Sequence, residues 1–245
     1  MSNKKNIVVW FSCGAASAVA AKLTLDKFGT KYNVIIANTP VTEEHPDNIR
    51  FKEDVSKWLV VPIIEIRNKE RSSSCVDIWK EDGIMSTIKY APCTKVIKKQ
   101  ARYNFEEQTN IYLNVLGFTV EEIDRHLRFV VNERYNHLPI LIANGYTKQM
   151  CFEHLQREGI KLPEAYKYYP NANCIGCVKA SSPTYWNKVR QHHPKIFEER
   201  AKQSRELNCK LVKYKGERMF LDELPINAKG GKLSSVECSI FCDVV

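Results

Sequence analysis

The sequence lacks any apolar run approaching the roughly 20 residues that a membrane-spanning helix needs. Its first residues, MSNKKNIVVWF, contain no small-residue cleavage site of the kind that ends a signal peptide. It also has no internal repeat and no low-complexity tract. With 44% hydrophobic and 27% charged residues, the composition is typical of a globular rather than a disordered protein. We therefore expect a cytoplasmic protein that makes no membrane contact.

Acidic side chains are also in short supply, with 28 Asp and Glu against 37 Lys and Arg. The resulting net charge of +9 suits a polyanionic partner, either a nucleotide or a nucleic acid. A solvated basic surface that keeps the protein soluble explains the charge equally well.

The nine cysteines are many for a reducing compartment, where structural disulfides are rare. They favour metal binding or thiol chemistry.

The first part of the chain alternates short apolar runs with amphipathic segments. Strands are predicted at 7–11, 32–38 and 60–66, and helices at 17–28 and 46–59. This rhythm is typical of an α/β fold with a parallel sheet, flanking helices and right-handed crossovers.

The rest of the chain is less regular. A strand is predicted at 111–118, followed by a helix over 120–132 that Thr119 caps, with Glu122 completing a capping box. Further elements are a helix from Thr147 to near Gly159, two helices within 182–208 and a hairpin at Lys215–Gly216. We expect a nucleotide-binding α/β domain at 1–165 and a cysteine-containing helical region with a short hairpin and tail at 166–245.

The loop SCGAAS joins the first predicted strand to the first predicted helix. Small side chains let backbone N–H groups at a helix N-terminus converge on a phosphate, and the hydroxyls of Ser12 and Ser17 add donors. Other nucleotide motifs fit badly, because the P-loop lysine is absent and Gly14 is the single glycine of the loop. A tight turn whose alanines pack against the sheet is the alternative.

The loop resembles the S-G-G-x-x-S loop of the PP-loop superfamily of adenine-nucleotide α-hydrolases, which have a HUP-like fold and include ATP pyrophosphatases, sulfonucleotide (PAPS) reductases and tRNA thiolation enzymes. The segments EEHPDNIRF, APCTKVIK, LGFTVEEIDR and NCIGCVKASSPTYWNKVRQHHPKIFEE extend the resemblance over about 7–199, most closely to the PAPS reductase-like branch. The resemblance implies that an adenine nucleotide such as ATP contacts Ser12, Cys13, Gly14, Ala15, Ala16, Ser17, Asn38, Lys95, Gly117, Glu122 and Arg125.

The loop departs from the family pattern at two positions. Cys13 replaces a glycine, and Ala16 stands where ATP pyrophosphatases carry an aspartate associated with Mg²⁺. Any Mg²⁺ would then use Glu44 or Asp47, or mainly phosphates and water.

The pair Cys174-x-x-Cys177 has the spacing of two ligands to one metal. The resemblance makes Cys93 the third ligand and implies a 4Fe–4S cluster whose open iron carries the sulfur chemistry. A fourth ligand would come from Cys238, Cys242 or Cys75. Structural zinc, with His192 or His193 as a partner, is the second interpretation, and ordinary loop side chains are the third.

The tail ECSIFCDVV holds Cys238 and Cys242, and Glu237–Cys238 faintly resembles the setting of the nucleophilic cysteine in PAPS reductases. A thiolate near a nucleotide and basic residues would be reactive, while an apolar tail packed on the body is the alternative. With Cys93, these two complete the expected catalytic cysteines.

The basic run Lys95, Lys98, Lys99 and Arg102 is either a phosphate or nucleic-acid contact or a solvated helix face.

The first hypothesis for function is an enzyme of sulfur transfer. ATP would adenylate an acceptor, a tRNA or DNA, and the cluster would deliver sulfur that a donor protein supplies. The second hypothesis is a sulfonucleotide reductase that uses a tail cysteine. The third is a nucleotide-binding module without catalysis, because fold alone does not settle function.

Overall fold

The computed structural model describes residues 4–87, 90–131 and 136–230, and these form two compact units. The first unit comprises Met1–Pro40, Pro46–Arg67 and Ala101–Glu164. The second comprises Val41–His45, Asn68–Gln100 and Ala165–Val245. No helix in the described part of the chain has the length and apolar character to cross a bilayer.

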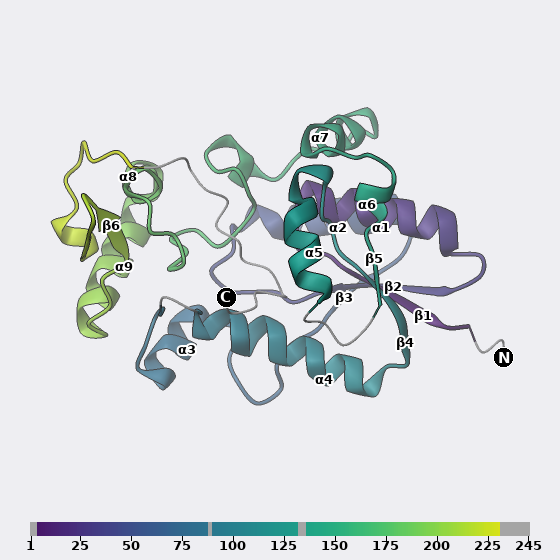
Figure 1. The fold of residues 1–245 in the computed structure, drawn as a ribbon, viewed down its shortest axis with the longest axis horizontal. Coiled ribbons are helices and arrows are strands. Elements are labelled where there is room, and N and C mark those ends of the chain that lie inside the picture. The colour runs from purple at the N-terminus through teal and green to yellow at the C-terminus, as the bar shows by residue number, and fades with distance from the viewer. Residues whose placement is uncertain (1–3, 88–89, 132–135, 231–245) are drawn as a thin grey trace. The chain divides into compact units, whose positions relative to one another are not determined.

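The first unit is built on a five-stranded parallel sheet with the strand order β3-β2-β1-β4-β5 (Figure 1). Its strands are β1 (Asn6–Trp10), β2 (Asn33–Asn38), β3 (Ile63–Glu65), β4 (Ile111–Val115) and β5 (His137–Leu138). Its helices are α1 (Ala15–Phe28), α2 (Asp47–Leu59), α4 (Ala101–Gln108), the 3₁₀ turn η2 (Val120–Glu122), α5 (Ile123–Val130), α6 (Ile140–Ala143) and α7 (Lys148–Arg157). The predicted parallel α/β fold with flanking helices is confirmed.

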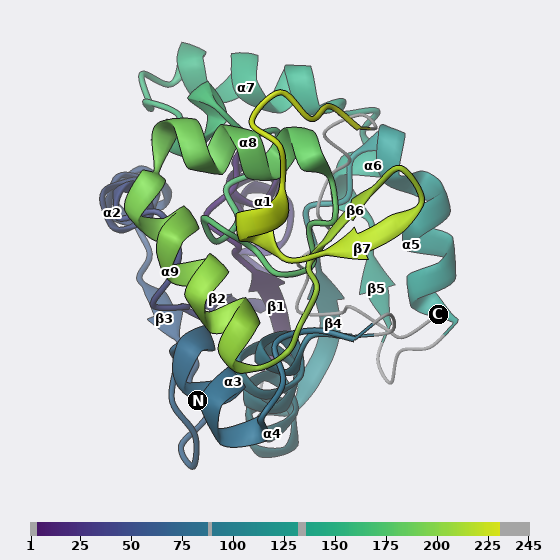
Figure 2. The same cartoon turned by 90° about the vertical axis from the view of Figure 1, so that its left-hand side faces the viewer.

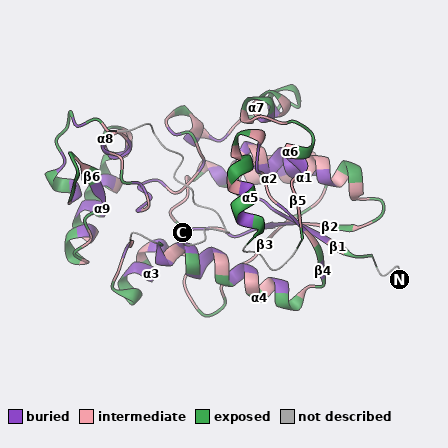
Figure 3. Cartoon of the chain, viewed as in Figure 1, coloured by how far each residue is buried: buried purple, intermediate pink, exposed green. Residues whose placement is uncertain are grey.

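Strand β1 lies at the centre of the sheet, between β2 and β4. Ile7, Val8 and Val9 are completely buried, because helices cover both faces of the sheet. Helix α1 lies on one face with α6 and α7 beside it, and α4 lies on the other (Figure 1). Within the sheet, β1 is the most deeply buried strand, whereas β3 and β5 are only partly buried (Figure 3).

A chain of buried polar groups runs between β1, β4 and α4. Trp10 Nε1 donates to Asn114 Oδ1 at 2.9 Å, and Asn114 Nδ2 donates to Glu106 Oε1 at 3.3 Å. Arg102, which is fully buried, pairs with the same Glu106 carboxylate at 3.5 Å. The proposal that Arg102 contacts a nucleic-acid backbone is therefore wrong, because its guanidinium is committed to a carboxylate inside the unit.

The second unit holds α3 (Cys75–Asp82), the π-helix η1 (Thr94–Gln100), α8 (Pro183–His192), α9 (Pro194–Glu206), the strands β6 (Val212–Tyr214) and β7 (Glu217–Met219), and the turn η4 (Leu221–Glu223). The 3₁₀ turn η3 (Glu164–Lys167) lies where the chain passes into it. Figure 2 shows α8, α9 and the hairpin facing the viewer. The two helices meeting at Pro194 and the antiparallel hairpin confirm the elements predicted for this region.

The hairpin turn is fixed by its two central residues. Lys215 and Gly216 have φ values of 51° and 90°, and two positive φ angles in succession are the requirement of a tight type I′ hairpin. Helix α3 was not predicted, although Ser74 caps it and Gly83 ends it in the left-handed conformation.

Candidate functional site

The loop after β1 lies where the order of the sheet reverses, because β2 pairs with one side of β1 and β4 with the other. In open parallel sheets this switch point, beyond the carboxyl ends of the strands, is the usual place for a ligand. Gly14 is the N-cap of α1 and brings no side chain to the helix end. The N-terminus of a 14-residue helix therefore opens at the switch point with its partial positive charge.

The loop is closed by its own hydrogen bonds. Ser17 Oγ donates to the Gly14 carbonyl at 2.8 Å and accepts from the Ser12 backbone N–H at 3.1 Å. Ser12 Oγ lies 3.3 Å from Ser17 Oγ. In this geometry the Ser17 hydroxyl, which is buried, holds the loop together.

Cys13 adopts the left-handed conformation with a φ of 55°, which glycine adopts without steric cost and a cysteine does not. Its side chain is nonetheless buried, and Asn38 Nδ2 approaches its sulfur at 3.8 Å. The same amide nitrogen donates to the Phe11 carbonyl at 2.8 Å. Asn38, at the end of β2, therefore supports the loop from the neighbouring strand.

Gly117 follows β4 and lies directly against the loop. A Cβ atom at this position would stand 2.7 Å from the Ser17 backbone nitrogen and 2.8 Å from the Ala16 carbonyl carbon. Both are backbone atoms that cannot turn aside. The predicted Gly117 is therefore brought to the loop by the pairing of β1 with β4, and only glycine fits there.

Glu122 and Arg125 lie at the turn that follows β4 and form an ion pair of 2.6 Å. Glu122 also completes the predicted capping box with Thr119. The Arg125 guanidinium lies 5.2 Å from the centre of the Phe118 ring. The pair is partly exposed at the same strand-end region as Gly117.

The second unit contains a small pocket whose wall includes four cysteines. Cys75 opens α3, Cys93 precedes η1, and Cys174 and Cys177 lie in the loop before α8. The remaining lining residues are Val41, Glu43, Trp79, Thr94, Lys98, Ile175, Gly176, Val178, Lys179 and Arg200. The pocket thus gathers Cys93, Cys174 and Cys177, as predicted, together with Cys75, which was only one of three options for a fourth ligand.

Three of the four thiols interact directly. The Cys75 thiol hydrogen-bonds with Cys174 and Cys93, and these bonds and its burial hold the pKa of Cys75 well above its ordinary value. The bond from Cys75 is the main cause that lowers the pKa of Cys93 to about 7, against the effect of burial. The Trp79 indole and the Lys98 ammonium favour the Cys93 thiolate in the same direction.

The CxxC turn is held by one tyrosine. The Cys177 backbone N–H donates to the Tyr185 hydroxyl at 2.9 Å, and that hydroxyl donates to the Cys174 carbonyl at 3.4 Å. Gly176 has a φ of 68° and makes the sharp turn between the two cysteines. Tyr185 is almost wholly buried in the core of this unit, so the turn rests on a rigid support.

Cys75 is positioned by the cap of α3. Ser74 Oγ accepts from the Asp77 N–H, and the Glu43 carboxylate accepts from the Cys75 N–H at 2.7 Å. Glu43 also accepts from the Ser74 hydroxyl at 2.7 Å. A carboxylate and a serine at a helix N-terminus both stabilise that end, so the first residue of α3 is firmly placed.

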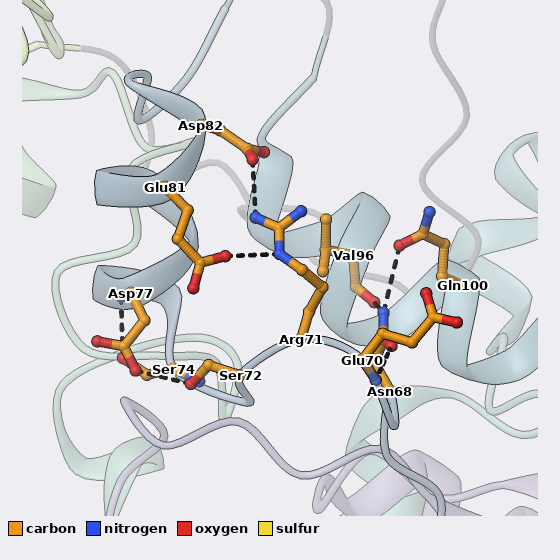
Figure 4. A network of polar contacts seen from close by, with 10 residues as sticks. All are labelled: Asn68, Glu70, Arg71, Ser72, Ser74, Asp77, Glu81, Asp82, Val96 and Gln100. Atoms are coloured by element: carbon orange, nitrogen blue, oxygen red, sulfur yellow. Dashed lines mark hydrogen bonds and ion pairs between the residues drawn. The ribbon is translucent and has the colours of Figure 1, made fainter.

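A network of polar contacts around α3 extends this support (Figure 4). Arg71 reaches both Glu81 at 2.6 Å and Asp82 at 2.7 Å near the end of the helix. Ser72 donates to the Asp77 carboxylate at 2.7 Å. The pattern of a serine cap, an acidic first turn and a closing Gly83 was readable in the sequence and is the signal that predicts α3 and the position of Cys75.

The predicted zinc partners lie elsewhere in the second unit. His192 stacks on Tyr168 with ring centres 4.1 Å apart, and His193 stacks on Tyr169 at 6.0 Å. Neither histidine lines the cysteine pocket.

Lys95 is exposed on η1, whereas Lys98 is buried and pairs with Glu44 at 3.3 Å. The predicted Cys238 and Cys242 lie outside the described residues.

No three or more histidine, cysteine, aspartate or glutamate side chains of the described residues are arranged as a group that could hold a metal ion. The fit of a metal centre therefore rests on the chemistry of the donors. Thiolates select zinc, copper(I) or iron–sulfur clusters, and four cysteines share this pocket. Metal binding would deprotonate the thiols and replace their mutual hydrogen bonds with metal–sulfur bonds. By the type of their donor atoms, the four cysteines are therefore suitable ligands for a zinc ion or an iron–sulfur cluster.

No protein-family model matches the chain. An uncharacterised protein of Methanocaldococcus jannaschii is 27% identical in an alignment 210 residues long that covers 80% of this chain and 40% of that protein. The chain thus spans about two fifths of the length of this curated relative. The U34-tRNA thiolase NcsA from Methanococcus maripaludis, solved with its 4Fe–4S cluster, is 13% identical, with 84% of this chain and 72% of that chain covered and a TM-score of 0.47.

Proposed function

We propose that this chain binds an adenine nucleotide at the loop Ser12–Ser17 and holds an iron–sulfur cluster on the pocket cysteines, in an enzyme that transfers sulfur to a nucleic acid. The observation that carries the proposal is the gathering of Cys75, Cys93, Cys174 and Cys177 around one pocket from three separate parts of the chain. Cysteine thiolates are the protein ligands that hold iron–sulfur clusters, and this pocket offers four of them.

The nucleotide half of the proposal is supported by the position and build of the loop. A helix N-terminus without a capping side chain opens at the switch point of a parallel sheet. Ser12 and Ser17 keep the loop backbone in one shape, and Gly117 leaves the room that this shape needs. Backbone N–H groups at such a helix end would bind the phosphates of ATP and stabilise the charge that develops as pyrophosphate leaves.

In the proposed reaction an oxygen of the acceptor attacks the α-phosphorus of ATP, and the bond to the bridging oxygen breaks to release pyrophosphate. Sulfide-level sulfur from a donor protein would then attack the activated carbon, and the carbon–oxygen bond would break to release AMP. Cys93, Cys174 and Cys177, with Cys75 beside them, would hold the cluster, which would supply an iron that binds the sulfur to be transferred. Excess Lys and Arg would favour tRNA or DNA as the acceptor.

The test is anaerobic purification, followed by a visible absorption spectrum and analysis of iron, sulfide and zinc. We expect a brown protein with about four irons. Cluster-loaded protein is then given ATP with tRNA or DNA, and released pyrophosphate and thiolated nucleosides are measured. The matched control is Cys209→Ser, because Cys209 donates to the Ser86 carbonyl and does not line the pocket.

Other outcomes separate the alternatives. Tight nucleotide binding by cluster-loaded protein without turnover of ATP would favour a binding module. Reduction of a sulfonucleotide that is lost in a Cys238→Ser, Cys242→Ser variant would favour a reductase. A colourless protein with one zinc or no metal would contradict the cluster.

A further inference from the structure

Two nitrogen atoms in the wall of the cysteine pocket are buried hydrogen-bond donors. They are Nε1 of Trp79 and Nε of Arg200, and within the described residues neither meets an acceptor at full hydrogen-bond geometry, although the Trp79 indole interacts with the Cys93 thiol. Trp79 is 2% exposed and Arg200 is 3% exposed, so bulk water does not satisfy them. Buried donors are rarely left without an acceptor, so two of them in one pocket indicate an occupant that accepts hydrogen bonds.

The Arg200 side chain is held firmly in this position. Its Nη1 donates to Gln203 Oε1 at 2.7 Å, and its guanidinium lies 4.9 Å from the centre of the Trp79 ring. A Cβ at Gly176 would stand 3.2 Å from Arg200 Cγ and 3.5 Å from Nε. The CxxC turn therefore packs directly on the arginine, and the absence of a side chain at Gly176 leaves room for it.

The Trp79 indole belongs to the same wall. Its N–H lies near the Cys93 thiol, close enough to favour the thiolate there. The other conspicuous acceptor in the pocket is the Glu43 carboxylate, which is already engaged by Ser74, Cys75 and Val76 at the start of α3. Four cysteine sulfurs line the same pocket and can accept hydrogen bonds.

We propose that Trp79 Nε1–H and Arg200 Nε–H donate hydrogen bonds to the sulfur atoms of the iron–sulfur centre in this pocket and thereby raise its reduction potential. This inference rests on the proposed function, because it needs a cluster on the pocket cysteines. Hydrogen bonds to cluster sulfurs favour the reduced, more negative state, and so does a nearby guanidinium charge. Both residues act on the cluster and not on the nucleic acid.

The decisive variant is Trp79→Phe, which removes the N–H and keeps an aromatic ring under the guanidinium. Its matched control is Trp186→Phe, because Trp186 is also fully buried but donates to the Ala180 carbonyl at 2.7 Å and does not line the pocket. Arg200→Lys keeps the charge and removes Nε, and it provides a second test should Trp79→Phe fold poorly. The measurement is a redox titration of the anaerobically loaded full-length protein. Its absorption and electron paramagnetic resonance signals report the fraction of reduced cluster and give the midpoint potential.

We expect Trp79→Phe and Arg200→Lys each to disfavour the reduced cluster by roughly tenfold, which for one electron is a shift of about 59 mV to more negative potential. Trp186→Phe leaves the potential unchanged while lowering thermal stability. Loaded variants whose potentials equal that of the wild type would overturn the donor role and leave the proposed function standing. A wild-type protein that takes up no iron would overturn both, and a shifted potential in a protein without sulfur transfer would support the donors and remove the function.

Discussion

The loop Ser12–Ser17 and the cysteine pocket are built in opposite ways. The loop is closed by hydrogen bonds among its own residues, and its shape follows from one strand running into one helix. The pocket takes its cysteines from the start of α3, from the residue before η1 and from the loop before α8. The geometry of the loop therefore depends on a few neighbouring residues. The geometry of the pocket depends on all the contacts that position its three segments, such as the cap of α3 and the hydrogen bonds of Tyr185.

The largest expected effect concerns the pocket and tests whether its cysteines act as one set. Serine in place of Cys75 should reduce bound iron as severely as serine in place of Cys93 or Cys174, since the Cys75 thiol contacts both others. Iron and sulfide analysis after anaerobic loading measures this. Cys209→Ser is the control and should keep its iron. Full iron content in Cys75→Ser would show that Cys75 is a neighbour of the centre and not a ligand.

The next largest effect concerns the loop and tests whether it tolerates a side chain at Gly117. Gly117→Ala should lower nucleotide affinity at least tenfold and destabilise the protein by about 2 kcal/mol, because the new Cβ would collide with backbone atoms of Ser17 and Ala16. Calorimetric titration with ATP and thermal unfolding measure the two quantities. Gly145→Ala provides the comparison, because that position has open space and a φ of 69° and should lose only about 1 kcal/mol. Equal behaviour of the two variants would show that the close approach at Gly117 is unimportant.

A smaller effect is expected at Cys13, where the loop departs from glycine. Cys13→Val should destabilise the loop by about 1–2 kcal/mol, because a β-branched side chain is strained at a φ of 55°. Cys13→Gly relieves the conformational cost but loses the buried thiol next to Asn38, so we expect it to bind ATP about as well as the wild type. Denaturant unfolding and ATP titration of both variants check this. Better binding by Cys13→Val than by Cys13→Gly would contradict the role assigned to the backbone.

The smallest effect lies away from both sites and concerns a histidine of the first unit. Burial is the main cause that lowers the pKa of His137 to about 4, and the charge of Arg102 adds to it. The folded protein therefore binds the proton more weakly than the unfolded chain, whose histidine titrates near 6.5. Stability from this group is complete above pH 6.5 and is lost as the pH falls from 6.5 to about 4.

We expect a loss of about 1–2 kcal/mol over this range, after allowance for the partial exposure of His137. Denaturant unfolding at pH 7 and pH 4.5 measures it, and His137→Phe should show a smaller difference between the two pH values. An identical pH dependence in that variant would exclude His137 as the cause.

Much of the first unit was readable from the sequence. The apolar runs of β1 and β2 and the amphipathic pattern of α2 predicted a parallel sheet, and the two strands are indeed buried where they meet the centre of the fold. The capping box at Thr119 and Glu122 was also predicted and is present. These features succeed because they depend on side-chain periodicity and on contacts between residues a few positions apart.

The basic run before and within α4 shows where such reasoning fails. Spacing placed Lys95, Lys98 and Arg102 on one helix face, yet Lys95 is exposed while Lys98 and Arg102 are buried against Glu44 and Glu106. Part of the run forms a π-helix, which changes the angular spacing of its residues. The Lys98–Glu44 pair depends on where a distant carboxylate comes to lie, which the spacing of the lysines does not reveal. Glu106 lies one turn along α4 from Arg102, but the burial of that pair depends on how the helix packs against the sheet.

The sequence by itself determined the strand–loop–helix at Ser12–Ser17, the alternation of strands and helices and the pair Cys174-x-x-Cys177, because each is a pattern over neighbouring residues. Tertiary structure alone decided that Cys75 contacts both Cys93 and Cys174, that Gly117 lies against Ser17, and that Trp79 and Arg200 line the cysteine pocket. The physical reason is that these contacts join residues far apart in the chain, and their geometry follows from strand pairing, from the cap of α3 and from packing around Tyr185. No local spacing encodes such distances.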